Sequence, residues 1–523
     1  MTNGILGKQL IIGSDLVERI PTWALYLLLA LISLAIYGQS IGFPLIWDSA
    51  QLITENQAIR AFDPIGAFTT PTTIGASGYS GQPFEQGGYY RPVLQLLFSG
   101  WYQFAGESSA LWHGLALAVN VVTVMLAFRL MQAMKQPQWA VFAIVLLFAV
   151  NPGRVSAITL VYGLSNQFFG VFILSAFLCW VREERWWSLG FFLLALGCRE
   201  TAVLYPLIAL IWELLFKKEN RPWVSLGAHV GLVAIYLVAR HLVGATAGLT
   251  ALSPVVWLNC VVVILSSHVH SLTWPSWGVR YYPLAEFSTL SPRALAGYSV
   301  LIGGLLALLW GWKRNRWVAF WLLWFGVWIS VHFNVGQFGE FLMDEKNNYL
   351  LALSFAALFV SLAKLSREYA LVLCLAVAVV QGGLSAWRAS HWHDPVTFYN
   401  SAIEQAPQFA TLHYNLGNAH VDAQAFPEAE EAFLKTVELA PGHSMAWNNI
   451  GNIRYMRQDL PGAARAWQNS FNANPMNMMA AHNLSLAYSR LGDQEAAALY
   501  YSRYLKLKAL QTAPLPAQPR AGD

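Results

Sequence analysis

The chain has 523 residues, of which 56% are hydrophobic and only 11% are charged. Soluble globular proteins carry about 25% charged residues, so this composition excludes a water-soluble enzyme for most of the chain. The net charge of +4 is small and spread over short segments, which argues against nucleic acid as a partner. The four cysteines lie in or beside apolar stretches without the paired spacing of a metal site, and we expect them to be packed in the interior.

Apolar runs long enough to cross about 30 Å of hydrocarbon recur along most of the chain. Eleven are predicted to span a membrane, starting near Pro21, Leu111, Trp139, Ser165, Trp186, Thr201, Trp223, Ala294, Trp317, Asn348 and Tyr369. Lysine and arginine concentrate in alternate gaps between the runs, as at Lys217, Lys313 and Lys364. Because basic gaps face the cytoplasm, the N-terminus is predicted to be cytoplasmic.

The segment 254–274 is also apolar, but a full crossing there would move Lys313 to the outside and break the alternation. It also carries His268 and His270, which are costly inside lipid. We therefore expect an interfacial or re-entrant helix on the outer side. With eleven crossings, the C-terminus is then outside.

After Trp387 the apolar runs end and a period of 34 residues begins. It is carried by Pro407, Pro441 and Pro475, by Asn415, Asn449 and Asn483, by Ala429, Ala463 and Ala497, and by Phe433, Trp467 and Tyr501. Glycine at Gly417 and Gly451, a small residue twelve further on, an aromatic four after that and a closing proline resemble the tetratricopeptide repeat, a helix pair. In such a pair the small residues permit close helix contact and the aromatic fills the gap, and Ser485 replaces the glycine in the third unit. Stacks of such pairs present a concave groove, so we expect a protein or peptide partner.

The predicted fold is all-α, a polytopic membrane helix bundle followed by an α-solenoid. The bundle occupies residues 1–388 and includes a long first outer loop at 42–109. The repeats occupy residues 389–511, and residues 512–523 form a frayed tail.

Polar and ionisable residues gather at the outer ends of the predicted spans. The candidates are Asp48, Glu55, Asn56, Tyr90, Arg91, His113, Arg199, Glu200, Glu345, Lys346 and Tyr349. A lone arginine or carboxylate beside lipid is often only solvated at the interface. Arg199 and Glu200 differ, because a charge pair enclosed between two apolar runs has to pair internally or face a watery cavity. That position favours a functional site.

The order of these positions resembles one known family. It comprises an acid ending the first span, Tyr-Arg-Pro at 90–92, Trp-His at 112–113, Asn-Pro at 151–152, Tyr-Gly at 162–163, Arg-Glu-Thr at 199–201, Glu-Lys at 345–346 and a repeat tail. This is similar to the transmembrane and tetratricopeptide-repeat-containing O-mannosyltransferases, which have the GT-C fold. The chain departs from the family pattern at Ser49, where a second acid is usual, and at Asn151, Ser156 and residues 163–166.

The resemblance implies an inverting glycosyltransferase. The compact loops indicate a bacterial inner membrane, and the alternation of basic gaps predicts that the site and the repeats lie on its periplasmic face. Such an enzyme moves a sugar from a polyprenyl-phosphate donor to a hydroxyl, here on a protein recruited by the repeats. Asp48 and Glu200 are the implied catalytic residues, and Asp48 is either the base or, with Glu200 or Glu55, a ligand of Mg²⁺ or Mn²⁺. The implied phosphate contacts are Arg91, Arg199 and Lys346.

Two other interpretations stay open from the sequence. One is a GT-C enzyme that transfers to a glycan or a lipid. The other is a non-catalytic membrane anchor that displays repeats for an envelope assembly. Ser49 in place of the second acid favours the anchor, whereas the ionisable residues at outer helix ends favour an enzyme.

Overall fold

A computed structural model of the chain describes residues 17–71, 89–217, 219, 221–245, 252–274, 279–281, 290–333, 341–363 and 366–512. The fold is helical apart from one short antiparallel pair within these residues, β1 (Val279–Tyr281) with β2 (Phe341–Asp344), in which Val279 lies opposite Asp344. Among the described residues, contacts separate a first unit that ends at Thr397 from a second that begins at Phe398.

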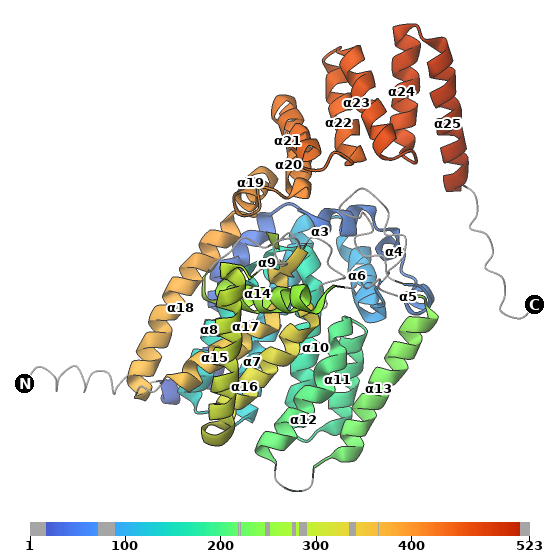
Figure 1. Cartoon of the computed structure of the whole chain (residues 1–523). Coiled ribbons are helices and arrows are strands. Elements are labelled where there is room, and N and C mark those ends of the chain that lie inside the picture. Colours follow the sequence, from blue (N-terminus) through green and yellow to red (C-terminus); the bar gives the residue numbers. More distant parts are fainter. Residues whose placement is uncertain are drawn as a thin grey trace, which may run out of the picture. The chain divides into compact units, whose positions relative to one another are not determined.

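The first unit is a bundle of apolar helices (Figure 1). Its longer helices are α2 (Thr22–Tyr37), α6 (Pro92–Ala105), α7 (Ser109–Ala133), α8 (Gln138–Ala149), α10 (Leu164–Val181), α11 (Arg185–Leu196), α12 (Tyr205–Phe216), α13 (Trp223–Leu242), α14 (Pro254–Thr273), α15 (Pro292–Arg314), α16 (Arg316–Ser330), α17 (Asn348–Leu362) and α18 (Arg367–Ser390). Its short helical segments are η1 (Gly38–Gly42), α3 (Asp48–Ala50), η2 (Gln51–Glu55), α4 (Gln57–Arg60), α5 (Pro64–Thr69), η3 (Pro152–Arg154), α9 (Val155–Thr159), η4 (Val161–Gly163), η5 (Glu200–Leu204), η7 (Val331–Phe333) and η9 (Glu345–Asn347). The predicted outer loop 42–109 is therefore largely helical in its described part.

Within the described residues, eight helical segments are long and apolar enough to cross a membrane, or nine if the bent pair α8 with η3 and α9 counts as one. This count, which rests on helix length and composition, is lower than the eleven predicted spans because three of the predicted helices are shorter than 18 residues. Helices α11 and α12 have 12 residues each, and α17 has 15. At 1.5 Å per residue they are roughly 18–23 Å long, short of a hydrocarbon core of about 30 Å.

Basic segments that connect different helices contact one another at one end of the bundle, here called the basic end. Lys217 Nζ lies 2.5 Å from Glu183 Oε1, and Arg316 Nη1 donates to Leu215 O at 3.0 Å. From this end α10 and α16 extend to the opposite end, here called the polar end, where Asn166 and His332 line a common cavity.

Helix α14 counts among the eight by length and composition, although we expected it to lie at the surface of a membrane. Near its start, Trp257 Nε1 donates to Phe333 O at 2.9 Å, and at its end Leu272 O accepts from Asn151 Nδ2 at 3.0 Å. It also contacts η3, η7 and β2, which all belong to the polar end. Because both ends of α14 contact the polar end, α14 lies across that end rather than along the bundle.

The second unit is a stack of helix pairs. After α19 (Pro395–Gln405) come α20 (Ala410–Asp422) with α21 (Phe426–Leu439), α22 (Ser444–Met456) with α23 (Leu460–Ala473), and α24 (Met478–Leu491) with α25 (Gln494–Thr512). A methyl group added at Gly417 would lie 2.5 Å from the Phe433 ring, and one at Gly451 would lie 2.4 Å from the Trp467 indole. The close contacts between small and aromatic residues that the period predicted are therefore confirmed in these two repeats.

The last repeat differs from that pattern. Tyr501, predicted to fill the same gap, is 50% exposed, while Tyr500 stacks on Tyr488 with 5.7 Å between ring centroids. The prediction for Tyr501 is wrong because Ser485 occupies the glycine position, and its side chain leaves less room for a ring.

We expect Ala463→Leu to destabilise the repeats, because Ala463 is fully buried between helices. Overpacking of this kind costs roughly 1–3 kcal/mol. Thermal unfolding of an isolated fragment, residues 394–511, measures it. The matched control is Ala498→Leu on the exposed face of α25, which should leave the midpoint unchanged. An equal effect of both substitutions would contradict the proposed repeat phase.

Candidate functional site

The segment after the first long helix contacts the polar end through the side chain of Ser49. Ser49 Oγ accepts a hydrogen bond from the backbone N–H of Tyr162 at 3.1 Å. Trp47, directly before Asp48, has φ +60°, a left-handed conformation that costs energy for a bulky side chain. The side chains of Asp48 and Glu55 lie outside the described residues, so their predicted roles stay predictions.

Two other predicted residues have structural partners. Asn56 caps α4 by accepting from Ala58 N at 3.0 Å, a usual N-cap interaction. His113 is 2% exposed within α7, and its ring lies 6.2 Å from the Phe43 ring. Neither residue faces the cavity described below.

Arg91 and Glu200 form a bidentate ion pair at the polar end. Arg91 Nε and Nη2 lie 2.9 Å and 2.8 Å from Glu200 Oε2, and the backbone N–H of Tyr90 donates to Glu200 Oε1 at 3.3 Å. Burial by itself would raise the pKa of the Glu200 carboxyl, but the Arg91 guanidinium and its hydrogen bonds lower that pKa below its usual value. Both groups are therefore charged and neutralise each other.

The pair is held in place by the backbone around it. Leu94 N donates to Gly197 O at 3.1 Å, and Tyr236 OH donates to Tyr90 O at 3.0 Å. A side chain at Gly197 would collide with Val93, since a methyl group there would lie 2.3 Å from Val93 Cγ2. Glycine is thus required for this close approach. Arg91 holds Glu200, and its predicted contact with phosphate stays a prediction.

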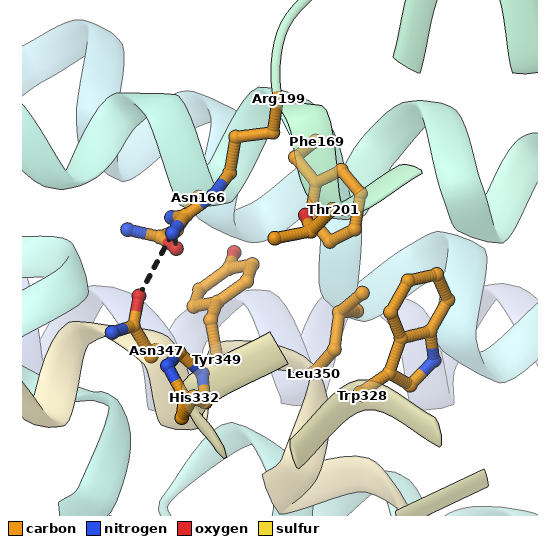
Figure 2. Close-up of a pocket in the computed structure, with 9 residues that line it drawn as sticks. All are labelled: Asn166, Phe169, Arg199, Thr201, Trp328, His332, Asn347, Tyr349 and Leu350. Atoms are coloured by element: carbon orange, nitrogen blue, oxygen red, sulfur yellow. Dashed lines mark hydrogen bonds between the residues drawn. The ribbon is translucent and has the colours of Figure 1, made fainter. Parts of the chain in front are cut away.

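Arg199, next to Glu200 in sequence, points to a different set of partners. Its Nη1 donates to Asn166 Oδ1, and its Nη2 donates to Asn347 Oδ1 at 3.0 Å. Figure 2 shows the guanidinium reaching between these two amides at the edge of a cavity. The cavity has a volume of about 30 Å³ and is lined by Asn166, Phe169, Arg199, Thr201, Trp328, His332, Asn347, Tyr349 and Leu350.

Glu345 and Lys346 have separate roles. Lys346 Nζ lies 4.4 Å from the centre of the Tyr162 ring, a cation–π contact. Glu345 forms a bidentate ion pair with Arg388, and both side chains are 1% exposed. Arg388 Nη1 also donates to Pro152 O at 3.0 Å. Glu345 therefore fixes the turn that carries Lys346 and Asn347.

Sequence reasoning missed a buried cation, Arg154. It is fully buried, and its Nη2 donates to Asn120 Oδ1 at 2.6 Å, while Nη1 donates to Phe148 O at 2.8 Å. Its guanidinium lies 4.5 Å from the centre of the Tyr349 ring. Over the part of the chain that the structure describes, no carboxylate lies within ion-pair distance of Arg154. The polar end thus carries a positive charge next to the residues of the cavity.

The residues that are described do not fit a metal site. No group of three or more His, Cys, Asp or Glu side chains that could hold a metal ion occurs among them. Both oxygens of Glu200 already accept hydrogen bonds from Arg91. The side chain of Asp48 lies outside the described residues, so the metal ion predicted for Asp48 with Glu200 or Glu55 stays a prediction, and no step below uses a metal.

The comparisons with known proteins concern the C-terminal part. The tetratricopeptide repeat family matches residues 380–444, 414–472 and 448–514. This region consists of such repeats, which are suited to binding a protein partner. A search of curated proteins gives no match.

Solved structures of MamA are also similar. The "Crystal structure of MamA" shares 18% identity over 27% of this chain and 78% of that chain, with a TM-score of 0.22. MamA from Desulfovibrio magneticus RS-1 shares 18% identity over 26% of this chain and 77% of that chain, with a TM-score of 0.22. At these values the similarity carries no argument about function.

We expect the Arg91–Glu200 pair to make stability depend on pH. Since the Glu200 pKa is lowered in the folded chain, the pair contributes fully above the usual glutamate pKa and loses its contribution as the pH falls through the lowered value. Glu200→Gln should cost about 3–5 kcal/mol at neutral pH, because it leaves Arg91 buried without its carboxylate.

Thermal midpoints of the detergent-purified chain across acidic and neutral pH provide the measurement. The Glu200→Gln variant should lose less stability on acidification than the wild type. Glu107→Gln, which removes an exposed pair with Arg60, is the control and should cost less than about 1 kcal/mol. Parallel pH profiles for the wild type and Glu200→Gln would contradict the assignment.

Proposed function

We propose that the chain is a membrane glycosyltransferase that moves a sugar from a polyprenyl-phosphate donor to a hydroxyl on a protein, which the repeats recruit. One observation carries the proposal. Segments far apart in sequence, around Ser49, Arg91, Tyr162, Arg199 and Lys346, meet at one end of an apolar bundle. Burying polar groups in an apolar bundle costs desolvation energy. That cost favours a functional role for the polar groups gathered at this end.

The proposed reaction needs a base, a group that accepts negative charge, and access from lipid and water. The oxygen of the acceptor hydroxyl attacks the anomeric carbon, and the bond from that carbon to the phosphate oxygen breaks. The hydroxyl proton passes to the Asp48 carboxylate, and the electron pair leaves with the polyprenyl phosphate. Attack on the face opposite the leaving group inverts the anomeric configuration.

The cations of the polar end suit the leaving phosphate. Lys346 supplies a point charge, and Arg199 supplies a planar fork of donors whose position is set by Asn166 and Asn347. Arg91 and Glu200 serve in this scheme as positioning residues, because they hold the turn that carries Arg199. Charge held in fixed positions stabilises a developing anion without a cost of reorganisation during the reaction.

A membrane-anchored repeat scaffold is the second candidate function, and the repeat match favours it. It requires the same membrane placement but no chemistry at the polar end. Loss of sugar transfer in site variants separates the two functions, because a scaffold has no transfer to lose.

The proposed topology places the basic end in the cytoplasm of a bacterial cell and the polar end and repeats in the periplasm. All four native cysteines are buried, so single cysteines introduced at exposed positions report their own location. In intact cells with a permeable outer membrane, an impermeant maleimide should label Glu107→Cys and Ala498→Cys but not Lys217→Cys. Labelling of Lys217→Cys with protection of the other two would reverse the topology and exclude a periplasmic site.

We expect Asp48→Asn to reduce sugar transfer by roughly 10²–10⁴-fold, the usual contribution of a general base. The assay is transfer of a radiolabelled sugar from polyprenyl phosphate by the purified chain at equal protein concentration. Asp63→Asn is the matched control, since Asp63 is an N-cap of α5 and asparagine caps equally well. Undiminished transfer by Asp48→Asn would remove Asp48 from the mechanism.

A further inference from the structure

The cavity at the polar end contains polar atoms that have no partner. Asn166 is 4% exposed, and its Nδ2 makes no hydrogen bond. Thr201 Oγ1 is also buried without a partner. Buried polar groups are nearly always hydrogen-bonded, and each unpaired one costs about 1–3 kcal/mol. Two such atoms in one cavity indicate that something outside the described chain completes their hydrogen bonds.

Both groups can donate a hydrogen bond. The amide orientation of Asn166 follows from its neighbour, because Arg199 Nη1 donates to Asn166 Oδ1 and leaves the Nδ2 hydrogens for the cavity. The Asn347 oxygen likewise accepts from Arg199. Thr201 contributes a hydroxyl, and Arg199 itself lines the wall. A ligand here is offered mainly hydrogen-bond donors.

The only charged side chain among the nine residues that line the cavity is a cation, Arg199. None of the cavity's nine lining residues, all of them described, is a carboxylate. Arg199 lines the cavity directly, and the Arg154 guanidinium lies 4.5 Å from the ring centre of Tyr349, which forms part of the wall. An anion would therefore gain both hydrogen bonds and Coulomb energy, whereas a neutral sugar hydroxyl would meet few acceptors for its own proton.

The size of the cavity limits what enters it. A volume of about 30 Å³ holds roughly two oxygen-sized atoms, since one water needs about 10–15 Å³ by the same measure. Two oxygens on one atom are what the non-bridging edge of a phosphate presents. Phe169, Trp328 and Leu350 form an apolar part of the wall, which suits a phosphate attached to a larger, partly apolar molecule (Figure 2).

We infer that this cavity binds the non-bridging oxygens of a lipid-linked phosphate, with Asn166 Nδ2, Thr201 Oγ1 and Arg199 as donors. The inference rests on the proposed function only for the identity of the lipid, a polyprenyl phosphate. It assigns Asn166 and Thr201, which no motif of the sequence singled out as ligands, to the phosphate.

The test is equilibrium binding of radiolabelled polyprenyl phosphate to the full chain in nanodiscs, without acceptor. Thr201→Val keeps the shape of the side chain and removes the donor, and Thr201→Ser restores the hydroxyl. A lost hydrogen bond to a charged group corresponds to roughly tenfold to a hundredfold weaker binding. Thr159→Val is the matched control, because Thr159 is buried outside the cavity and donates to Val155 O at 2.8 Å.

The expected result is weaker binding by Thr201→Val alone, and little binding of the corresponding polyprenol, which lacks the phosphate. Equal affinity of wild type and Thr201→Val would overturn the inference, as would no binding by the wild type or equal affinity for polyprenol. Inorganic phosphate that competes as strongly as the lipid phosphate would overturn the assignment to a lipid-linked group.

The same variants separate this inference from the proposed function. Phosphate binding that depends on Thr201, in a chain that transfers no sugar, would support the inference and reject the glycosyltransferase. Sugar transfer by the wild type together with unchanged binding by Thr201→Val would do the reverse.

Discussion

The bidentate ion pair of Arg91 and Glu200 determines how the polar end of the first unit is built. It ties the turn before α6 to the turn after α11, and the hydrogen bond from Leu94 N to Gly197 O secures the same junction. With Glu200 committed to Arg91, the neighbouring Arg199 extends toward Asn166 and Asn347. Glu200 and Arg199 are adjacent in sequence but bind different partners, and the partners of Arg199 line the cavity.

A second constraint is the balance of charge inside an apolar bundle. Burying ionic groups costs several kcal/mol each, and pairing in good geometry recovers that cost. Glu345 and Arg388 meet this condition through two hydrogen bonds. The buried charge of Arg154 is stabilised differently. Its guanidinium donates hydrogen bonds to a carbonyl and an amide oxygen and makes cation–π contacts with two aromatic rings. The polar end therefore retains positive charge beside the cavity, which is the electrostatic basis for an anionic ligand.

The two units differ in what stabilises them. In the first, the short segments η3, η5 and η9 position polar side chains between long apolar helices. In the second, glycine and alanine let neighbouring helices approach, and Phe433 and Trp467 fill the space beside Gly417 and Gly451. The proposed chemistry is assigned to the first unit, whereas the second unit has the features of a surface for a protein partner.

The sequence by itself determined the helical class, the repeats and the apolar character of the first unit. Each of these depends on composition or on a repeat spacing, and both can be read directly from the linear sequence. It did not show that α11, α12 and α17 are shorter than 18 residues, since apolarity alone does not reveal where a helix stops. It assigned Arg91, Arg199, Glu200 and Lys346 to one functional site, but it did not show which of them pair with which partners. Only the tertiary structure decided that Glu200 neutralises Arg91, that Arg388 neutralises Glu345, and that Asn166 and Thr201 face a common cavity. Partners separated by 109 or 43 residues leave no local pattern, so the folded chain alone shows which charges are paired and which cavity they leave between them.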